Sequence, residues 1–186
     1  MVPERADANA RLIGGMVVTQ PRMYAFPAWD HWLVARDGRI AMVTYEPYRV
    51  AYVTPDGRRI QGEPIPYARI RVDAALKDQF MAERNQVRAG RPTPPAPTAW
   101  PEVLPPYLGS AVFASDGLLW IPRAVAAGRP PLYDIIDGNG RLVERVELPA
   151  RHKLVGFGKD VIYLVRFDED DLQYLQRHPL PTSARP

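Results

Sequence analysis

The sequence predicts an all-β fold built from repeated units of short antiparallel strands. Three observations support this prediction. Asp-Gly pairs stand between short apolar runs, where glycine supplies the positive φ that a tight hairpin turn requires. Proline provides 21 of the 186 residues, which favours short elements with frequent turns over long helices. The same order of turns occurs twice, the second time about 80 residues after the first.

The first unit covers residues 30–66 and shows the turn plan clearly. Asp37-Gly38 and Asp56-Gly57 each separate two apolar runs, so each predicts a hairpin. The expected strands are residues 32–35, 40–43, 49–53 and 58–61.

The second and third units repeat this plan. The second unit, residues 107–149, turns at Asp116-Gly117 and at Asp137-Gly138-Asn139-Gly140. Its expected strands are residues 111–113, 118–121, 132–136 and 142–148. The third unit, residues 150–180, offers only three strands, at 154–157, 161–165 and 172–175.

An insertion of different composition separates the first two units, at residues 67–106. Asp73 is placed to cap a helix over residues 74–87. Prolines 92, 94, 95 and 97 then predict an extended connector. Without this insertion the repeat is about 40 residues long, which is typical of four-stranded propeller blades. We therefore expect one domain, a partial β-propeller of about three blades with an inserted helix and a proline-rich connector.

The strand count also predicts association. Three blades do not close a ring, and an open blade exposes an unpaired edge and an apolar face. A strand expected at residues 15–20 has no blade of its own and is a candidate to complete the third blade, in the same chain or in a second copy. We therefore expect a homodimer or larger assembly, or association with the missing half of a propeller.

Several segments resemble the predicted six-bladed β-propeller proteins of bacteria, which are distantly similar to NHL and TolB-like propellers. They are residues 32–52 with their Asp-Gly-Arg turn, 100–107, 131–134 (Pro-Leu-Tyr-Asp) and 168–174. The resemblance implies a six-bladed architecture, of which this chain looks like the C-terminal half, and it implies no particular activity. Such proteins usually carry an export signal, whereas residues 1–11 show no signal-peptide pattern. The compartment stays open.

Composition argues against several classes of protein. The net charge is +3, and the cations are dispersed at turn exits such as Arg39, Arg58 and Arg141, so no nucleic-acid-binding patch is predicted. The longest apolar runs are too short to cross a bilayer. With no cysteine, the chain has no disulfide and no thiolate site.

The candidate binding residues are Asp30, His31, Trp32, Tyr45 and Trp100. Aromatic side chains on loops at one mouth of a propeller channel form a binding surface, although packing between blades is the competing interpretation. The histidines are scattered and no serine stands in a nucleophile elbow, so no catalytic residue is identified. We expect a non-catalytic binding or scaffold module. The alternatives are a lactonase-like propeller hydrolase with a divalent cation, or a truncated fragment of a longer propeller.

One acidic run, Asp168-Glu169-Asp170-Asp171, is a candidate metal site. Four carboxylates offer the hard oxygen ligands that Ca²⁺ prefers, but the run lacks the glycine and distal glutamate of a calcium-binding loop. A solvated loop is the favoured interpretation, and pairing with arginines of a neighbouring blade or subunit is a further alternative. No other cofactor is expected.

Overall fold

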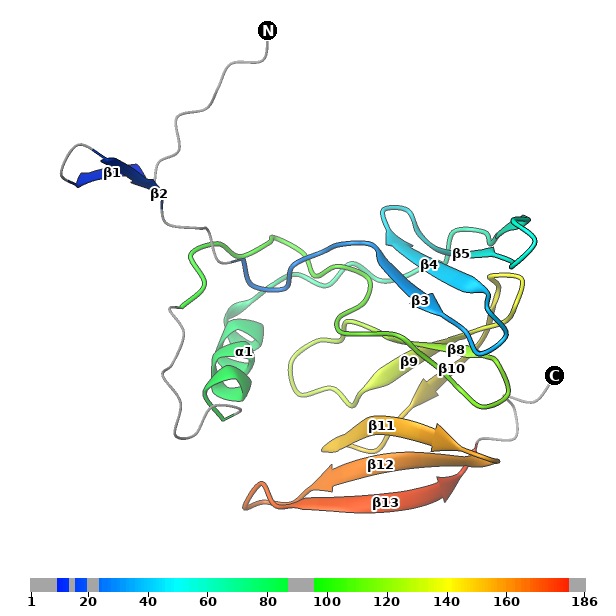
Figure 1. Cartoon of the computed structure of the whole chain (residues 1–186). Coiled ribbons are helices and arrows are strands. Elements are labelled where there is room, and N and C mark those ends of the chain that lie inside the picture. The colour runs from blue at the N-terminus through cyan, green and yellow to red at the C-terminus, as the bar shows by residue number, and fades with distance from the viewer. Residues whose placement is uncertain (1–9, 14–15, 20–23, 87–95, 181–186) are drawn as a thin grey trace, which may run out of the picture.

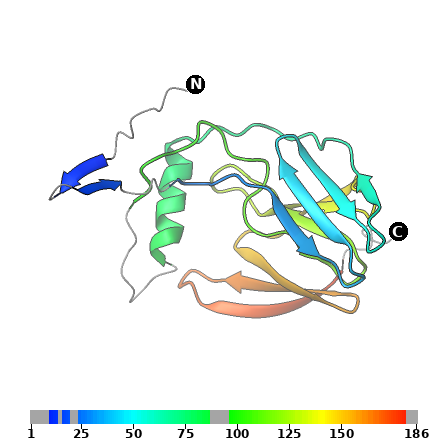
Figure 2. The same cartoon turned by 45° about the horizontal axis from the view of Figure 1, so that its top comes forward.

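The computed structural model describes residues 10–13, 16–19, 24–86 and 96–180. Its regular structure is mostly β, arranged as three successive antiparallel sheets and a two-stranded hairpin, with one helix among the described residues. The all-β prediction is confirmed. Figure 1 shows the three sheets stacked in chain order, and Figure 2 shows the same layers from a second direction.

The first sheet is a four-stranded meander. It consists of β3 (His31–Val34), β4 (Ile40–Tyr45), β5 (Tyr48–Val53) and β6 (Arg59–Gln61). At the turn between β3 and β4, Gly38 has a φ of 82° and the Asp37 carboxylate accepts a hydrogen bond from the Arg39 amide. This is the turn chemistry that the Asp-Gly pair predicts.

The second and third sheets follow the same plan. The second consists of β7 (Val112–Phe113), β8 (Leu119–Pro122), β9 (Leu132–Ile136) and β10 (Leu142–Glu147). The third consists of β11 (His152–Gly158), β12 (Val161–Phe167) and β13 (Gln173–Pro179). In every sheet the spatial order of the strands follows the sequence, as in the blades of a propeller.

Consecutive sheets pack face to face. Strand alternation directs one face of the second sheet, with Leu119 and Ile121, toward the first sheet, and the other face, with Trp120, toward the third. Val50 contributes to the first interface and Leu164 to the second. The three layers therefore share two apolar interfaces, which gives a partial propeller-like fold.

The insertion contains α1 (Ala74–Gln86), which lies beside the stacked sheets (Figure 1). The Asp73 carboxylate accepts a hydrogen bond from the Leu76 amide at 2.9 Å, so the predicted cap is confirmed. Leu76 packs with Leu104 and Ala124 in a small cluster separate from the two sheet interfaces. The predicted helix end at residue 87 lies outside the described residues.

The N-terminal strand does not complete the third sheet of its own chain, which was one of the two expected pairings. β2 (Met16–Thr19) pairs with β1 (Ala10–Ile13) in an antiparallel hairpin, not with the third sheet of its own chain. A local hairpin closes a short loop, whereas pairing with the third sheet would close a loop of more than one hundred residues. Completion of the third sheet in a second copy stays a prediction.

Within the described residues, no helix is both long enough and apolar enough to span a membrane.

Candidate functional site

Two adjoining cavities form a groove where the chain enters the first and second sheets. Their volumes are about 200 Å³ and 190 Å³, and both are lined by Ala28, Tyr45 and Pro105. We call this surface the aromatic groove, because its lining also includes the following aromatic and proline residues: Phe26, Pro27, Trp29, His31, Tyr67, Pro101, Pro106 and Tyr107.

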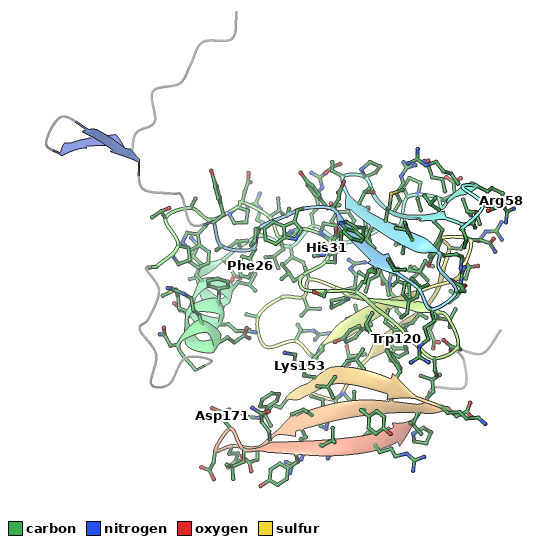
Figure 3. All side chains as sticks on the ribbon, viewed as in Figure 1. Phe26, His31, Arg58, Trp120, Lys153 and Asp171 are labelled. Carbon is green, nitrogen blue, oxygen red and sulfur yellow. The ribbon has the colours of Figure 1, made fainter. Side chains whose placement is uncertain are left out.

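The rings of the groove contact one another from rim to floor. Trp29 and Tyr45 form the rim and are 56% and 37% exposed. The His31 ring lies 6.2 Å from that of Trp29 and 5.5 Å from that of Tyr107, which it meets edge-on. Figure 3 labels His31 at the start of β3. The groove thus combines exposed aromatic faces with a packed aromatic floor.

Hydrogen bonds fix this floor. The Tyr107 hydroxyl lies 2.8 Å from the Trp29 carbonyl oxygen and 3.1 Å from that of Val43. Burial raises the pKa of Tyr107, and the nearby Asp30 charge raises it further, so the phenol stays neutral and donates. The Asp30 carboxylate in turn accepts a hydrogen bond from the Tyr45 amide at 3.1 Å.

Behind the groove lies a buried ionic network that sequence reasoning missed. Asp134 is fully buried and accepts hydrogen bonds from the Tyr48 hydroxyl at 2.9 Å, Arg123 at 2.9 Å and Arg145 at 3.0 Å. Arg123 also donates to the Pro106 carbonyl and lies over the Tyr48 ring. The available signal was a carboxylate inside the apolar run of residues 132–136.

The structure brings three of the five predicted binding residues together. His31 and Tyr45 line the aromatic groove. Asp30 accepts a hydrogen bond from the Tyr45 amide, but it lines the adjoining cavity on the outer face of the first sheet, which His31 also lines. Trp32 lies on the opposite face of the first sheet, and Trp100 packs against Phe80 of the helix with ring centroids 5.5 Å apart. A role in binding stays a prediction for each of them.

Among the described residues, no sheet or helix packs on the outer face of the first sheet, which is turned away from the second sheet. This face carries a shallow cavity of about 610 Å³ lined by Trp32, Ile40, Met42, Arg49 and Ala51, among others. Trp32 is 73% exposed. We call this surface the first open face.

The third sheet likewise has a face on which no described sheet or helix packs. Leu154, Ile162 and Leu164 point into the interface with the second sheet, so alternation places Tyr163, Val165 and Leu175 on the other side. Leu175 is 69% exposed. We call this surface the third open face.

Equivalent hairpins of the three sheets meet at a further depression of about 610 Å³. It receives Arg36 from the β3–β4 turn, Asp116 from the β7–β8 turn, and Lys159 and Asp160 from the β11–β12 turn. Its charged side chains are of mixed sign, and Leu180 contributes to its lining.

The acidic run forms a local turn between β12 and β13. One Asp168 oxygen accepts hydrogen bonds from the amides of Asp170 and Leu172, and Asp171 pairs with Arg151 at 3.1 Å. In the region that the structure describes, no three acidic or histidine side chains converge in a way that could hold a metal ion. Figure 3 shows Asp171 at the tip of this turn.

Comparisons of the chain with protein-family models, with curated proteins and with solved structures find no match.

Proposed function

We propose that the protein is a non-catalytic binding or scaffold module that works as half of a six-bladed ring, with a second copy supplying the other half. The observation that carries this proposal is the pair of open faces at the two ends of the sheet stack. Trp32 on the first and Leu175 on the third are large apolar side chains left mostly in water.

Each open face corresponds to a sheet face that, elsewhere in the chain, packs against a neighbouring sheet. We call the face of a sheet that points toward the next sheet in chain order its trailing face, and the opposite face its leading face. Each internal interface joins the trailing face of one sheet to the leading face of the next, and a cluster of buried apolar side chains lies in each interface. The first open face is a leading face and the third open face is a trailing face. Two copies related by a two-fold axis would bring each third open face onto the partner's first open face and close both ends.

Burial of the apolar surface of the two open faces would stabilise the assembly. Apolar surface removed from water contributes roughly 25 cal/mol per Å². Large exposed apolar patches on soluble proteins mark interaction sites. Within the ring, the aromatic groove and the hairpin depression would be presented at fixed positions as contact surfaces.

Size-exclusion chromatography with light scattering tests the proposal on the full chain. The wild type is expected at twice the monomer mass of 21.0 kDa, while Trp32→Arg and Leu175→Asp each shift it to the monomer. Val143→Asp is the matched control, because Val143 is 50% exposed on β10, away from both open faces. A monomeric wild type, or equal dissociation by the control, would contradict the proposal.

A further inference from the structure

We propose that the aromatic groove is a carbohydrate-binding site that takes an uncharged oligosaccharide. All of its lining residues come from one chain, so the site does not need the second copy that closes the ring. Figure 3 labels Phe26, which lines the larger of its two cavities, and His31, which lines the smaller.

The rim of the groove offers aromatic surface to a ligand. Trp29 and Tyr45 are 56% and 37% exposed, and Tyr45 lines both cavities. A pyranose ring presents faces of C–H groups, and such apolar faces pack on aromatic side chains. The exposed rings therefore match the faces of a sugar, and two adjoining cavities of similar volume match two linked sugar residues.

Polar side chains beside these rings match the hydroxyl groups of a sugar. Glu46 and Arg69 line the larger cavity, and Ser110 lines the smaller. Within the described residues, neither Glu46 nor Arg69 has a side-chain hydrogen bond or an ion pair. A carboxylate only accepts hydrogen bonds and a guanidinium only donates them. A ligand that satisfies both must donate and accept, as every sugar hydroxyl does.

The charge of the lining favours an uncharged ligand. One carboxylate, Glu46, and one guanidinium, Arg69, line the groove, so their charges cancel. Asp30 belongs to the adjoining cavity on the first open face, which Arg49 and Arg59 also line. An ionic ligand would lose hydration in the groove without gaining a net opposite charge.

The lining also favours a sugar over a peptide. Pro27, Pro101, Pro105 and Pro106 line the groove, and proline has no backbone N–H to bind the carbonyl groups of a peptide. A proline-rich peptide would in turn bring few N–H donors for the Glu46 carboxylate.

The groove is held in shape before any ligand arrives. The Tyr107 hydroxyl ties the entry segment at Trp29 to β4 at Val43. The Arg123 guanidinium lies over the Tyr67 ring, 5.6 Å from its centroid. A preformed site loses little conformational entropy on binding, which favours capture of a short oligosaccharide.

The groove adjoins the first open face, and this contact decides which variants are useful. His31 and Glu46 line the groove and also the cavity on that face. Trp29 and Arg69 line the groove but not the cavity on the open face. Substitutions of Trp29 and Arg69 therefore test the groove without changing the open face.

Calorimetric titration of the full chain tests the site. The probes are cellotetraose, maltotetraose, β-1,4-mannotetraose and tetra-N-acetylchitotetraose, and saturable binding of at least one of them is expected. Trp29→Ala should weaken this binding about tenfold or more, as for an aromatic residue central to an interface. Trp29→Phe keeps an aromatic face and should retain most of the affinity. Arg69→Met should weaken binding because it removes the guanidinium donors.

The matched control is Trp32→Ala, which removes an exposed tryptophan from the first open face and should leave the affinity unchanged. Because the probes are uncharged, their affinity should be the same in about 0.05 M and about 0.5 M NaCl. Absence of saturable binding for every probe, or binding that survives Trp29→Ala, would overturn the site. A decaproline peptide that binds where no sugar does would assign the groove to a peptide.

Failure of this site and failure of the ring give different results. Leu175→Asp, which is expected to be monomeric, should bind the sugar with wild-type affinity. A monomeric wild type that binds a probe contradicts the ring alone. An associated wild type that binds no probe contradicts the carbohydrate site alone.

Discussion

Trp120 and Trp32 stand on faces of neighbouring sheets but in opposite environments. Trp120, on β8 and labelled in Figure 3, is completely buried between the second and third sheets. Its ring centroid lies 5.1 Å from that of Phe157. Trp32, on β3, is 73% exposed. Both strands supply an apolar face, so the difference lies in whether another sheet covers it. The first open face therefore resembles a sheet face of an internal interface, but no described sheet packs on it.

The two internal interfaces also differ from each other. The first includes the Asp134 network and a close backbone approach between Gly62 and Gly140, whereas the second is formed by apolar side chains around Trp120. The stability of the first interface therefore depends on the hydrogen-bond partners of Asp134 and on the close fit of the two backbones. The stability of the second interface depends on how well its apolar side chains fill the space between the sheets.

The largest expected effect is at the second interface. Trp120→Ala should lower the free energy of unfolding by about 4 kcal/mol, because it removes a fully buried indole and leaves a cavity. Trp32→Ala should change the free energy of unfolding of the monomer by less than about 0.5 kcal/mol. Urea unfolding at a concentration too low for association measures both. Similar losses for the two variants would mean that the open face already has a cover within the chain.

At the first interface, Asp134→Ala should cost about 3 kcal/mol, because it leaves Arg123 buried without its carboxylate partner. Arg145→Gln is the matched control and should cost much less, since the Arg145 side chain is 42% exposed. Chemical unfolding provides the comparison. Equal effects would show that the network does not depend on burial.

Backbone fit at the first interface is tested by glycine substitution. Gly62→Ala should cost about 2 kcal/mol, because its Cβ would lie 2.1 Å from the Gly140 carbonyl oxygen. A Cβ at Gly57 would meet no neighbouring atom, but the residue has a positive φ of 84°. Gly57→Ala should therefore lower the free energy of unfolding by only about 1 kcal/mol. The difference in thermal midpoint reports the contact between sheets, and a reversed order would contradict it.

The smallest effect is expected at the acidic turn. Loss of hydration alone would raise the pKa of Asp168, but hydrogen bonds from the Leu172 amide and the Tyr174 hydroxyl lower it. A lowered pKa stabilises the fold above the unfolded value of about 3.9 and ceases to do so as pH falls through the folded value. Asp168→Asn should therefore lower the melting temperature slightly at pH 7 but not at pH 2.5. Glu169→Gln is the control and should leave the melting temperature unchanged at both pH values.

Calcium is the second readout on this turn. For a solvated turn, Ca²⁺ leaves the melting temperature of the wild type unchanged. A rise of several degrees that Asp168→Asn removes would assign a metal site to the turn.

The sequence predicted the local structure closely. Asp-Gly turns, strand alternation and the Asp73 cap are set by neighbouring residues, so the strands of the first sheet agree with prediction to within about two residues. The helix start at Ala74 follows from the same kind of local signal.

Long-range features were not predictable in the same way. Asp134 interacts with Tyr48 across 86 positions of sequence, and no periodicity shows that pairing. Likewise, the aromatic residues were recognisable, but which of them would meet depends on how the chain enters each sheet. Tyr45 joins His31 at the groove, whereas Trp100 packs on the helix.

Site-specific crosslinking tests the six-bladed assembly most directly. The chain has no cysteine, so Ala51→Cys on the first open face and Gln173→Cys on the third provide unique attachment points on the third strand of each sheet. Stacking of the third sheet on the partner's first sheet predicts that a short bis-maleimide links a mixture of the two variants into a heterodimer and links neither variant to itself. Crosslinking of Ala51→Cys to itself, or no crosslink in the mixture, would contradict closure of the ring by a second copy.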